Sequence, residues 1–396
     1  MIQTKLLKLI LINNMNYKLC YKITKVKPSS TLILDKQAKD MIRAGKAVIN
    51  LTAGELDFPV PIEIRKKVAG AAKKGFNLYT PAAGLLNLKK EIILKLKRDN
   101  NLTYGLDQII ATNGAKQSLY TIFQVLLNEG DEVIVPVPYW VSYVEQIKLA
   151  GGKPVLANCD KDFNLDVKAI AEKITKKTKA IIINSPNNPT GKVYSEKTLK
   201  ALAKTVKSKN IYVISDEIYE KMIYEKKHIS IAKFLKNQTL IVNGFSKSHA
   251  ITGWRIGYTA GPQDIISAMT NLQSHASGNV SNLSQIAGII ALKTKNRAPG
   301  IFLEQLKKRR EILINYFSKI KGAKIAEPEG AFYIFFKIPK LTNNSDKFCQ
   351  NLLKHGKVAM VPGHCFGKEG YVRLSYANST KNIIRALKRI DKFINK

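Results

Sequence analysis

The chain has 396 residues, of which 45% are hydrophobic, so it is long enough for two or three domains with large cores. Lys and Arg number 65 against 29 Asp and Glu, a formal net charge of +36 spread along the whole chain. This spread favours a solvated surface over a basic arm that binds nucleic acid or a membrane. The four cysteines lie far apart without CxxC spacing, so we expect no metal site, no disulfide framework and a cytoplasmic protein.

The first residues form a short apolar run, from Leu6 to Ile12, that Lys8 interrupts. This run is too short to span a bilayer, and no Ala-x-Ala cleavage site follows it, which argues against a secretory signal. Because Met15 follows directly, we predict that residues 1–25 are an extension whose first 14 residues precede the true start of translation. The alternative, an organellar transit peptide, would be expected to contain arginine, and this stretch has none.

Between residues 26 and 107 helical periodicity alternates with glycine-containing loops. Gly54 lies in the first of these loops, and a glycine permits either a tight turn or a close approach of the backbone to a ligand. Tyr79 lies in the second loop. The predicted elements are a helix over 31–46, a strand over 47–51, a loop over 52–59, a helix over 61–76, a loop over 77–84 and a helix over 85–98.

From residue 108 to residue 244 strands and helices alternate, as in a mainly parallel sheet with helices on both faces. The predicted strands are 108–112, 131–136, 179–184, 211–215 and 240–244, with helices over 115–127, from 138 onward and over 195–208. Polar side chains or glycines follow these strands. Ligands bind at the carboxyl edge of such sheets, so we expect one site to be lined there by Gly114, Trp140, Asp216 and Lys247.

After about residue 300 the pattern changes to longer helices between short strands. This region predicts a second, smaller α+β unit that the N-terminal segment completes. The expected elements are helices over 301–316, 346–355 and 381–395, and strands over 330–338, 358–361 and 371–376.

Lys247 follows an apolar strand within the stretch NGFSKSHAITGWRIGY, residues 243–258. In a closed pocket, loss of water lowers the pKa of a lysine, which can then carry a cofactor aldehyde as a Schiff base. Asp216 ends another strand, three residues before Tyr219. A buried carboxylate there would keep a pyridine nitrogen protonated, and the tyrosine would hydrogen-bond a phenolate oxygen. The alternative for Asp216 is a helix N-cap.

Three further features fit ligand binding, and each has a structural alternative. The turn at Gly114, with a helix from Ala115, would present N–H groups and a helix dipole to a phosphate, although one glycine is also an ordinary turn. Trp140 would stack on a planar ring or pack in the core. Arg373, inside an alternating strand, would grip a carboxylate with two parallel bonds or form a structural ion pair.

A series of collinear stretches from Val26 to the last helix resembles the fold type I pyridoxal-phosphate enzymes. The resemblance is to class-I aminotransferases of the bacterial aspartate aminotransferase type, subgroup Iβ. The stretches are LTAGELDFP, LYTPAAG, ATNGAKQSL, VPYWVSY, NSPNNPTG, SDEIYE, GFSKSHAITGWRIGY and YVRLSYA. The resemblance implies a large domain with a mainly parallel seven-stranded sheet, over 61–300, and a smaller α+β domain over 301–396 that is joined by the segment 26–60.

The resemblance also implies pyridoxal 5′-phosphate as the cofactor, amino acids and keto acids as substrates, and a homodimer with shared active sites. Lys247 resembles the Schiff-base lysine, and Asp216 the partner of the pyridine nitrogen. The other implied cofactor contacts are Tyr219 and Asn188 at O3′, Trp140 stacked on the ring, Gly114, Ala115, Ser246 and Arg255 at the phosphate, and Tyr79 reaching the phosphate from the other subunit. The implied substrate contacts are Arg373 on the α-carboxylate, helped by Asn188 and Gly54, with Trp140 and Lys116 nearby.

Lys116 bears on the choice of substrate, because a lysine at this place in the subgroup reaches the distal carboxylate of aspartate or glutamate. The expected reaction is the exchange of an amino group between L-aspartate and 2-oxoglutarate. The alternatives are amination of prephenate, for which Thr31 and Lys116 are informative, another aminotransferase, or a lyase on this fold. The sequence departs from the family at Leu56, His249 and His364–Cys365, none of which has a catalytic role. A nucleic-acid-binding regulator on the same fold is the alternative that the charge suggests.

Overall fold

The computed structural model describes residues 20–24, 26, 30–293, 298–339 and 344–395. The predictions for residues 1–14, including the start of translation, lie outside these ranges, and so does the side chain of Thr31. Within the described ranges, no helix combines the length and the apolar character that crossing a membrane requires.

A seven-stranded sheet forms the larger part of the molecule, in the order β2-β8-β7-β6-β5-β3-β4. Strand β8 runs antiparallel to β2 and β7, and the other neighbours are parallel. The predicted mainly parallel seven-stranded sheet is therefore confirmed. The strands are β2 (Ile109–Thr112), β3 (Glu132–Val137), β4 (Lys153–Asn158), β5 (Thr178–Asn184), β6 (Tyr212–Asp216), β7 (Thr239–Gly244) and β8 (Gly257–Ala260).

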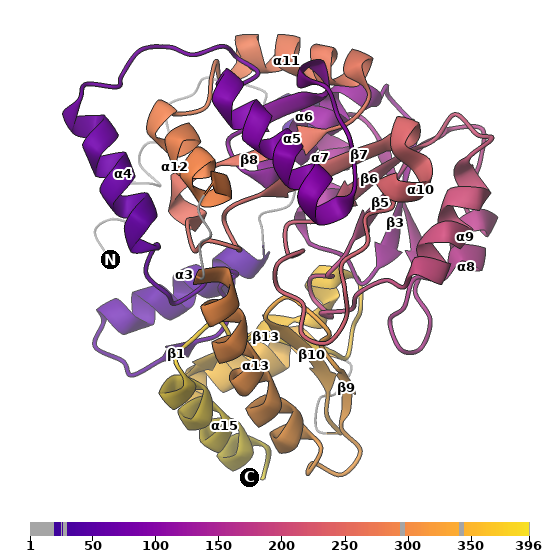
Figure 1. The fold of residues 1–396 in the computed structure, drawn as a ribbon. Helices are drawn as coiled ribbons and strands as arrows, with labels where there is room; N and C mark the ends of the chain where they lie inside the picture. The colour runs from indigo at the N-terminus through magenta and orange to yellow at the C-terminus, as the bar shows by residue number, and fades with distance from the viewer. Residues whose placement is uncertain (1–19, 25, 27–29, 294–297, 340–343, 396) are drawn as a thin grey trace, which may run out of the picture.

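Helices cover both faces of this sheet (Figure 1). Alternate residues of a strand point to opposite faces, and β5 shows this directly: Ile182 packs toward one helix layer, while Ile181 and Ile183 pack toward the other. The first layer contains α6 (Ala115–Leu126), α7 (Ser142–Leu149) and α11 (Gln263–Ala276). The second contains α5 (Leu86–Asn100), α8 (Val167–Glu172), α9 (Glu196–Val206), α10 (Ala232–Leu235) and α12 (Asn282–Lys293), with α4 (Ile62–Lys73) packed on α12.

Two smaller sheets lie below the large one in Figure 1. One is antiparallel, in the order β12-β13-β10-β9, and the other pairs β1 with β11 in parallel. The strands are β1 (Ile49–Asn50), β9 (Lys324–Ala326), β10 (Tyr333–Lys337), β11 (Val358–Ala359), β12 (Val361–Pro362) and β13 (Val372–Ser375). The predicted single strand over 358–361 is thus wrong, because its two halves join different sheets.

The helices around the small sheets follow the predicted periodicity. Helix α15 (Thr380–Ile394) begins after Ser379, whose side chain caps it by accepting from the backbone N–H of Asn382. Its buried residues, spaced by three and four, put an apolar stripe on the small sheets. The neighbouring helices are α3 (Ser30–Arg43), α13 (Ala298–Phe317) and α14 (Ser345–Asn351), whereas the short α2 (Tyr21–Thr24) contacts α7. The domain boundaries near residues 60 and 300 stay a prediction.

Candidate active site

A cavity of about 570 Å³ opens at the carboxyl edge of the seven-stranded sheet. Its size falls within the range of roughly 300–1,000 Å³ that is typical of small-molecule sites. The wall combines residues that follow β3, β5, β6 and β7 with the first turn of α6, the loop after β1 and strand β13. The predicted residues in this wall are Gly54, Ala115, Lys116, Trp140, Asn188, Asp216, Tyr219, Ser246, Lys247, Arg255 and Arg373.

Lys247 lies three residues beyond the end of β7. Its Nζ donates a hydrogen bond to the backbone carbonyl of Gly54, in the loop after β1. A Cβ atom added to Gly54 would lie 2.7 Å from the hydroxyl oxygen of Tyr333, so a larger residue would have to displace this buried phenol. Burial lowers the pKa of the Lys247 amine to about 8. Roughly a tenth of the amine is therefore neutral and nucleophilic at pH 7, a few hundred times more than for an ordinary lysine.

Asp216 is the last residue of β6 and is buried. Its Oδ2 accepts a hydrogen bond of 2.6 Å from the hydroxyl of Tyr143, and its Oδ1 accepts one of 3.3 Å from the backbone N–H of Ile218. Burial raises the pKa of the Asp216 carboxyl to about 6. After β6 the next described helix is α10, which begins at Ala232, so the N-cap interpretation is wrong. The carboxylate is instead presented to the cavity.

Arg373 extends from β13 into the same cavity and is buried. Its Nη1 donates to Oδ1 of Asn188 at 3.0 Å and its Nη2 donates to the carbonyl of Thr52 at 2.5 Å. No carboxylate in the described ranges forms an ion pair with it, so the structural ion pair is wrong. The buried Nε has no hydrogen-bond partner there. A buried, uncompensated guanidinium that lines a cavity is suited to a carboxylate ligand.

A second cationic subsite lies where β2 leads into α6. Gly114 has φ +87° and precedes the first residue of α6; it does not itself line the cavity, whereas Ala115 and Lys116 at the start of the helix do. Backbone N–H groups in a first helical turn lack intrahelical partners. The guanidinium of Arg255 donates to the carbonyls of Thr252 and Asn113, at 2.8 and 3.2 Å. A Cβ atom on Gly114 would lie 2.6 Å from Nη2 of Arg255, so this packing requires glycine. Together with the buried Ser246, these groups have the chemistry that suits an anion.

Lys116 and Trp140 lie side by side in the wall. The Nζ atom of Lys116 is 5.0 Å from the centroid of the Trp140 ring, and Trp140 meets Tyr143 edge to face at 5.4 Å. Partial burial and the nearby Arg255 lower the pKa of Lys116. No carboxylate in the described part of the chain pairs with this amine. Lys116 is therefore a further cation of the cavity wall without a carboxylate partner among the described residues, besides Arg373 and Arg255.

Tyr79 does not join the cavity of its own chain. Its side chain is 96% exposed, and the adjacent Leu78 is 79% exposed. Large hydrophobic side chains are rarely this exposed in succession on a free surface.

Sequence reasoning also missed residues that the structure places in the wall, among them Thr52, Glu55, Tyr143, Asn184 and Tyr333. Only Tyr143 had a signal, as part of the aromatic cluster around Trp140.

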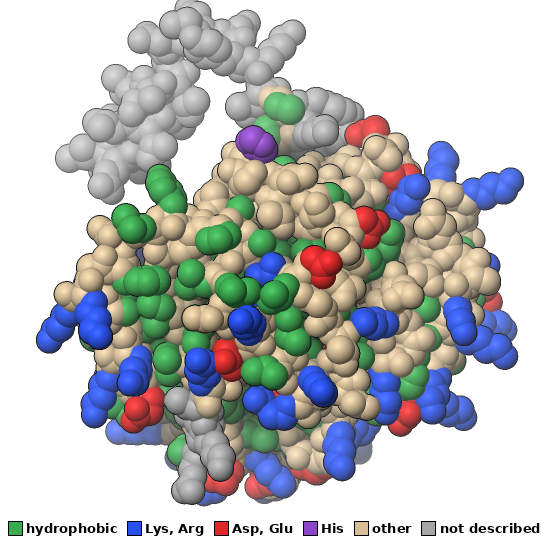
Figure 2. All heavy atoms as spheres, turned by 45° about the horizontal axis from the view of Figure 1, so that its top comes forward, with side chains coloured by type: hydrophobic (Ala, Val, Ile, Leu, Met, Phe, Trp, Pro, Cys, Tyr) green, Lys and Arg blue, Asp and Glu red, His purple; other side chains and the backbone are tan. Residues whose placement is uncertain are grey.

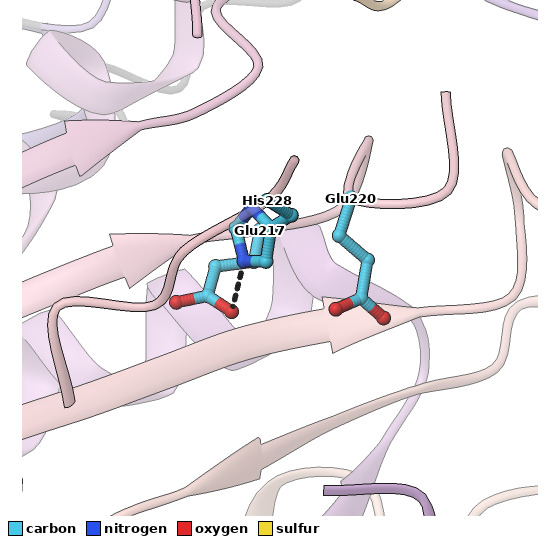
Figure 3. A group of neighbouring side chains, drawn as sticks. All are labelled: Glu217, Glu220 and His228. Atoms are coloured by element: carbon cyan, nitrogen blue, oxygen red, sulfur yellow. Dashed lines mark hydrogen bonds and ion pairs between the residues drawn. The ribbon is translucent and has the colours of Figure 1, made fainter. Parts of the chain in front are cut away.

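Glu217, Glu220 and His228 form a compact group (Figure 3), close enough to hold a metal ion by distance alone. Glu217 directly follows the cavity residue Asp216 in the chain. The ligand atoms of the three side chains are already engaged. His228 Nε2 pairs with Glu217 at 2.9 Å, and the amine of Lys95 forms a buried ion pair with Glu220. The Lys95 cation thus already neutralises the Glu220 carboxylate, and His228 neighbours that of Glu217, so these side chains are explained by their mutual pairing.

A family model described as aminotransferase class I and II matches residues 46–390. An amine of lowered pKa, a buried carboxylate and separate cationic subsites agree with this class, and the chain belongs to the class I and II aminotransferase family. It is similar to the aspartate aminotransferase of Bacillus subtilis, with 45% identity over 390 residues, which cover 96% of this chain and 99% of that protein. A probable aspartate/prephenate aminotransferase of Rickettsia bellii is 41% identical, with 94% and 97% coverage.

Solved structures give the same result. The aspartate aminotransferase of Thermus thermophilus with maleate superposes with a TM-score of 0.92 at 37% identity, covering 95% of this chain and 99% of that one. The enzyme of Thermotoga maritima gives 0.90 at 39% identity, with 96% and 100% coverage. The predicted family, fold class and enzyme class are confirmed.

Proposed function

We propose that this enzyme is a pyridoxal 5′-phosphate-dependent aminotransferase that exchanges the amino group between L-aspartate and 2-oxoglutarate, giving oxaloacetate and L-glutamate. The observation that carries the proposal is the placement of two cations without carboxylate partners, Arg373 and Lys116, in the cavity that also holds the Lys247 amine. Two cations suit a substrate with two carboxylates. The names of the relatives from Bacillus subtilis and Thermotoga maritima support the same substrate.

The cavity fits the cofactor group by group. When bound, pyridoxal phosphate supplies an aldehyde that condenses with amines and a ring that accepts electrons. The glycine-requiring cradle at Gly114, with Ala115, Ser246 and Arg255, would hold the phosphate. The remaining contacts would be Asp216 at the ring nitrogen, Tyr219 and Asn188 at the phenolate oxygen, Trp140 on the ring face and the Lys247 amine at the aldehyde.

Lys247 would then move the reacting proton. A pKa near 8 matches an amine that takes a proton from Cα of the amino acid and gives it back, because a general base works best near the operating pH. Asp216 stays ionised opposite a protonated ring nitrogen, since a cation nearby offsets the effect of burial on its pKa. The fork of Arg373 would hold the α-carboxylate so that the Cα–H bond faces Lys247.

We also propose a homodimer in which Tyr79 completes the cofactor site of the partner subunit. Its 96% exposure and its position next to the exposed Leu78 suit a residue that is buried only on association. Several relatives carry names that include prephenate, so prephenate is the second candidate acceptor. A direct comparison of 2-oxoglutarate, oxaloacetate and prephenate as acceptors distinguishes the two functions.

Lys116→Met tests whether Lys116 binds the distal carboxylate of the substrate. A charge-assisted hydrogen bond is worth about 1.5–3 kcal/mol, so kcat/KM for aspartate should fall by roughly 10- to 100-fold. The rate with alanine, which lacks the second carboxylate, should change little. Lys200→Met, on the outer side of α9, removes an exposed lysine from the pair with Glu196 and serves as the matched control. An equal loss for aspartate and alanine would show that Lys116 does not read the distal carboxylate.

A further inference from the structure

Tyr333, in strand β10, touches two groups on which the proposed function depends. Its side chain is almost fully buried, and its hydroxyl oxygen lies 2.8 Å from the hydroxyl oxygen of Tyr219. The guanidinium carbon of Arg373 lies 4.4 Å from the centroid of its ring. The phenol thus joins the residue expected at the cofactor to the residue expected at the substrate carboxylate. The same hydroxyl occupies the space that a side chain on Gly54 would need.

We propose that Tyr333 is a positioning residue, whose hydroxyl directs the proton of Tyr219 toward the cofactor and whose ring fixes the plane of the Arg373 guanidinium. The proposal rests on the proposed function, because it gives Tyr219 and Arg373 the roles stated there. Tyr333 would act on cofactor and substrate only through Tyr219 and Arg373.

The direction of the hydrogen bond follows from counting protons. Each phenol has one O–H, and within the described part of the chain Tyr333 is the one hydrogen-bond partner of the Tyr219 hydroxyl. If Tyr219 donates to the phenolate oxygen of the cofactor, Tyr333 must donate to Tyr219. A hydroxyl oxygen that accepts a hydrogen bond becomes a better donor, since linked hydrogen bonds polarise one another. Tyr333 therefore strengthens the bond that Tyr219 makes.

The ring acts on Arg373 in a different way. Tyr333 and Phe366 both present ring faces to the guanidinium, at 4.4 and 5.0 Å, and the Nη atoms donate to Asn188 and Thr52. The rings attract the cation without neutralising it, as an acidic partner would. The guanidinium is held in one plane and keeps its charge for a ligand.

Tyr333→Phe removes the hydroxyl and keeps the ring, so the two effects separate. With a weaker donor at the phenolate oxygen, that oxygen carries more negative charge. The Lys247 nitrogen joined to the cofactor, which would share a proton with this oxygen, then keeps the proton to higher pH. The midpoint of the pH-dependent absorbance of the bound cofactor should rise by about 0.5 to 1 pH unit, the equivalent of one neutral hydrogen bond. The dissociation constant for maleate, a dicarboxylate probe, should stay within about twofold, because the cation–π contact remains.

Tyr333→Leu removes the ring as well. It should produce the same midpoint shift and also weaken maleate binding by about tenfold, the loss expected for a desolvated cation–π contact. The matched control is Tyr376→Phe. It removes a similar hydroxyl–hydroxyl hydrogen bond, between Tyr376 and Tyr224 at 2.9 Å, and neither residue lines the cavity. Tyr376→Phe should leave the midpoint and the maleate affinity unchanged. Thermal melts of all variants monitor the fold.

An unshifted midpoint in Tyr333→Phe, or equal shifts in Tyr333→Phe and Tyr376→Phe, would overturn the inference alone, provided that the wild type binds the cofactor and transfers amino groups. A wild type that shows no cofactor absorbance would overturn the proposed function and this inference together. A midpoint shift confined to the Tyr333 variants, with weaker maleate binding only in Tyr333→Leu, supports both parts.

Discussion

Burial beneath the loop that carries Gly54 holds the pKa of the Lys247 amine at about 8, against 10.5 for an ordinary lysine. Because burial disfavours the charged form, the neutral amine becomes the main form as the pH rises through 8. The rate at which cofactor-free protein takes up pyridoxal phosphate should therefore increase about tenfold between pH 7 and 9 and then level off. Stopped-flow absorbance measures this rate. A rate that keeps increasing toward pH 10 would show that the lysine is not shifted.

Single residues differ in how well the sequence alone predicts them. Lys247, Asp216 and Arg373 are charged side chains next to or inside apolar strands, and although each alone has a structural alternative, their joint pattern indicates a site. Tyr333 and Asn184 also lie on or at the end of a strand, but uncharged residues occur there for many reasons. Only packing shows that Tyr333 meets Tyr219 and Arg373. The exposure of Tyr79 in one chain likewise depends on the folded arrangement of its loop.

At the scale of elements, the loop that follows β6 is fixed by a buried carboxylate. Oε1 of Glu217 accepts hydrogen bonds from the hydroxyls of Ser215 and Ser230, at 2.9 and 2.6 Å, and Oε2 pairs with His228 (Figure 3). These bonds tie the loop to the strand end that presents Asp216. Glu217 therefore holds one wall of the site from outside it.

Glu217→Ala should lower the free energy of unfolding by about 1–3 kcal/mol, because it leaves buried donors without acceptors. Glu196→Ala, which removes an exposed carboxylate from an ion pair on α9, should leave it nearly unchanged. Chemical denaturation of both variants makes the comparison. Equal stability of the two would contradict the structural role of Glu217.

Elements with strong periodicity could be predicted closely, and elements defined by pairing could not. Helix α15 and strands β5 and β7 lie within a few residues of their predicted bounds. Strand β4 is partly exposed at the sheet edge and lacks a continuous apolar run, so the sequence contains no clear signal for it. The division of residues 358–362 between two sheets depends on the partners β1 and β13, which local sequence cannot specify.

At the scale of the whole molecule, the high positive charge is dispersed. Figure 2 shows Lys and Arg side chains scattered over the face it presents, with hydrophobic side chains gathered between them. Dispersed charge is typical of a solvated surface, whereas nucleic-acid binding usually needs a continuous basic patch. The absence of a nucleic-acid partner and the cytoplasmic location stay predictions.

The shared site of the proposed homodimer predicts complementation between two defective variants. Lys247→Ala and Tyr79→Ala subunits should each be impaired as homodimers. In a mixed dimer, one site would contain both defects and the other would combine an intact Lys247 with an intact Tyr79. Mixed refolding should therefore give more activity than the sum of the parents. If Tyr79 served its own chain, both sites would be defective and no gain would appear.

The most direct measurement of the central claim is the rate of oxaloacetate formation from L-aspartate and 2-oxoglutarate by the wild type and by Lys247→Ala. The wild type should turn over in the presence of pyridoxal phosphate. The variant should lose at least about 10²- to 10⁴-fold of the rate, since both the amine that holds the cofactor and the proton-transfer base are gone. Lys200→Ala should match the wild type. Full turnover by Lys247→Ala, or no turnover by the wild type, would contradict the proposed function.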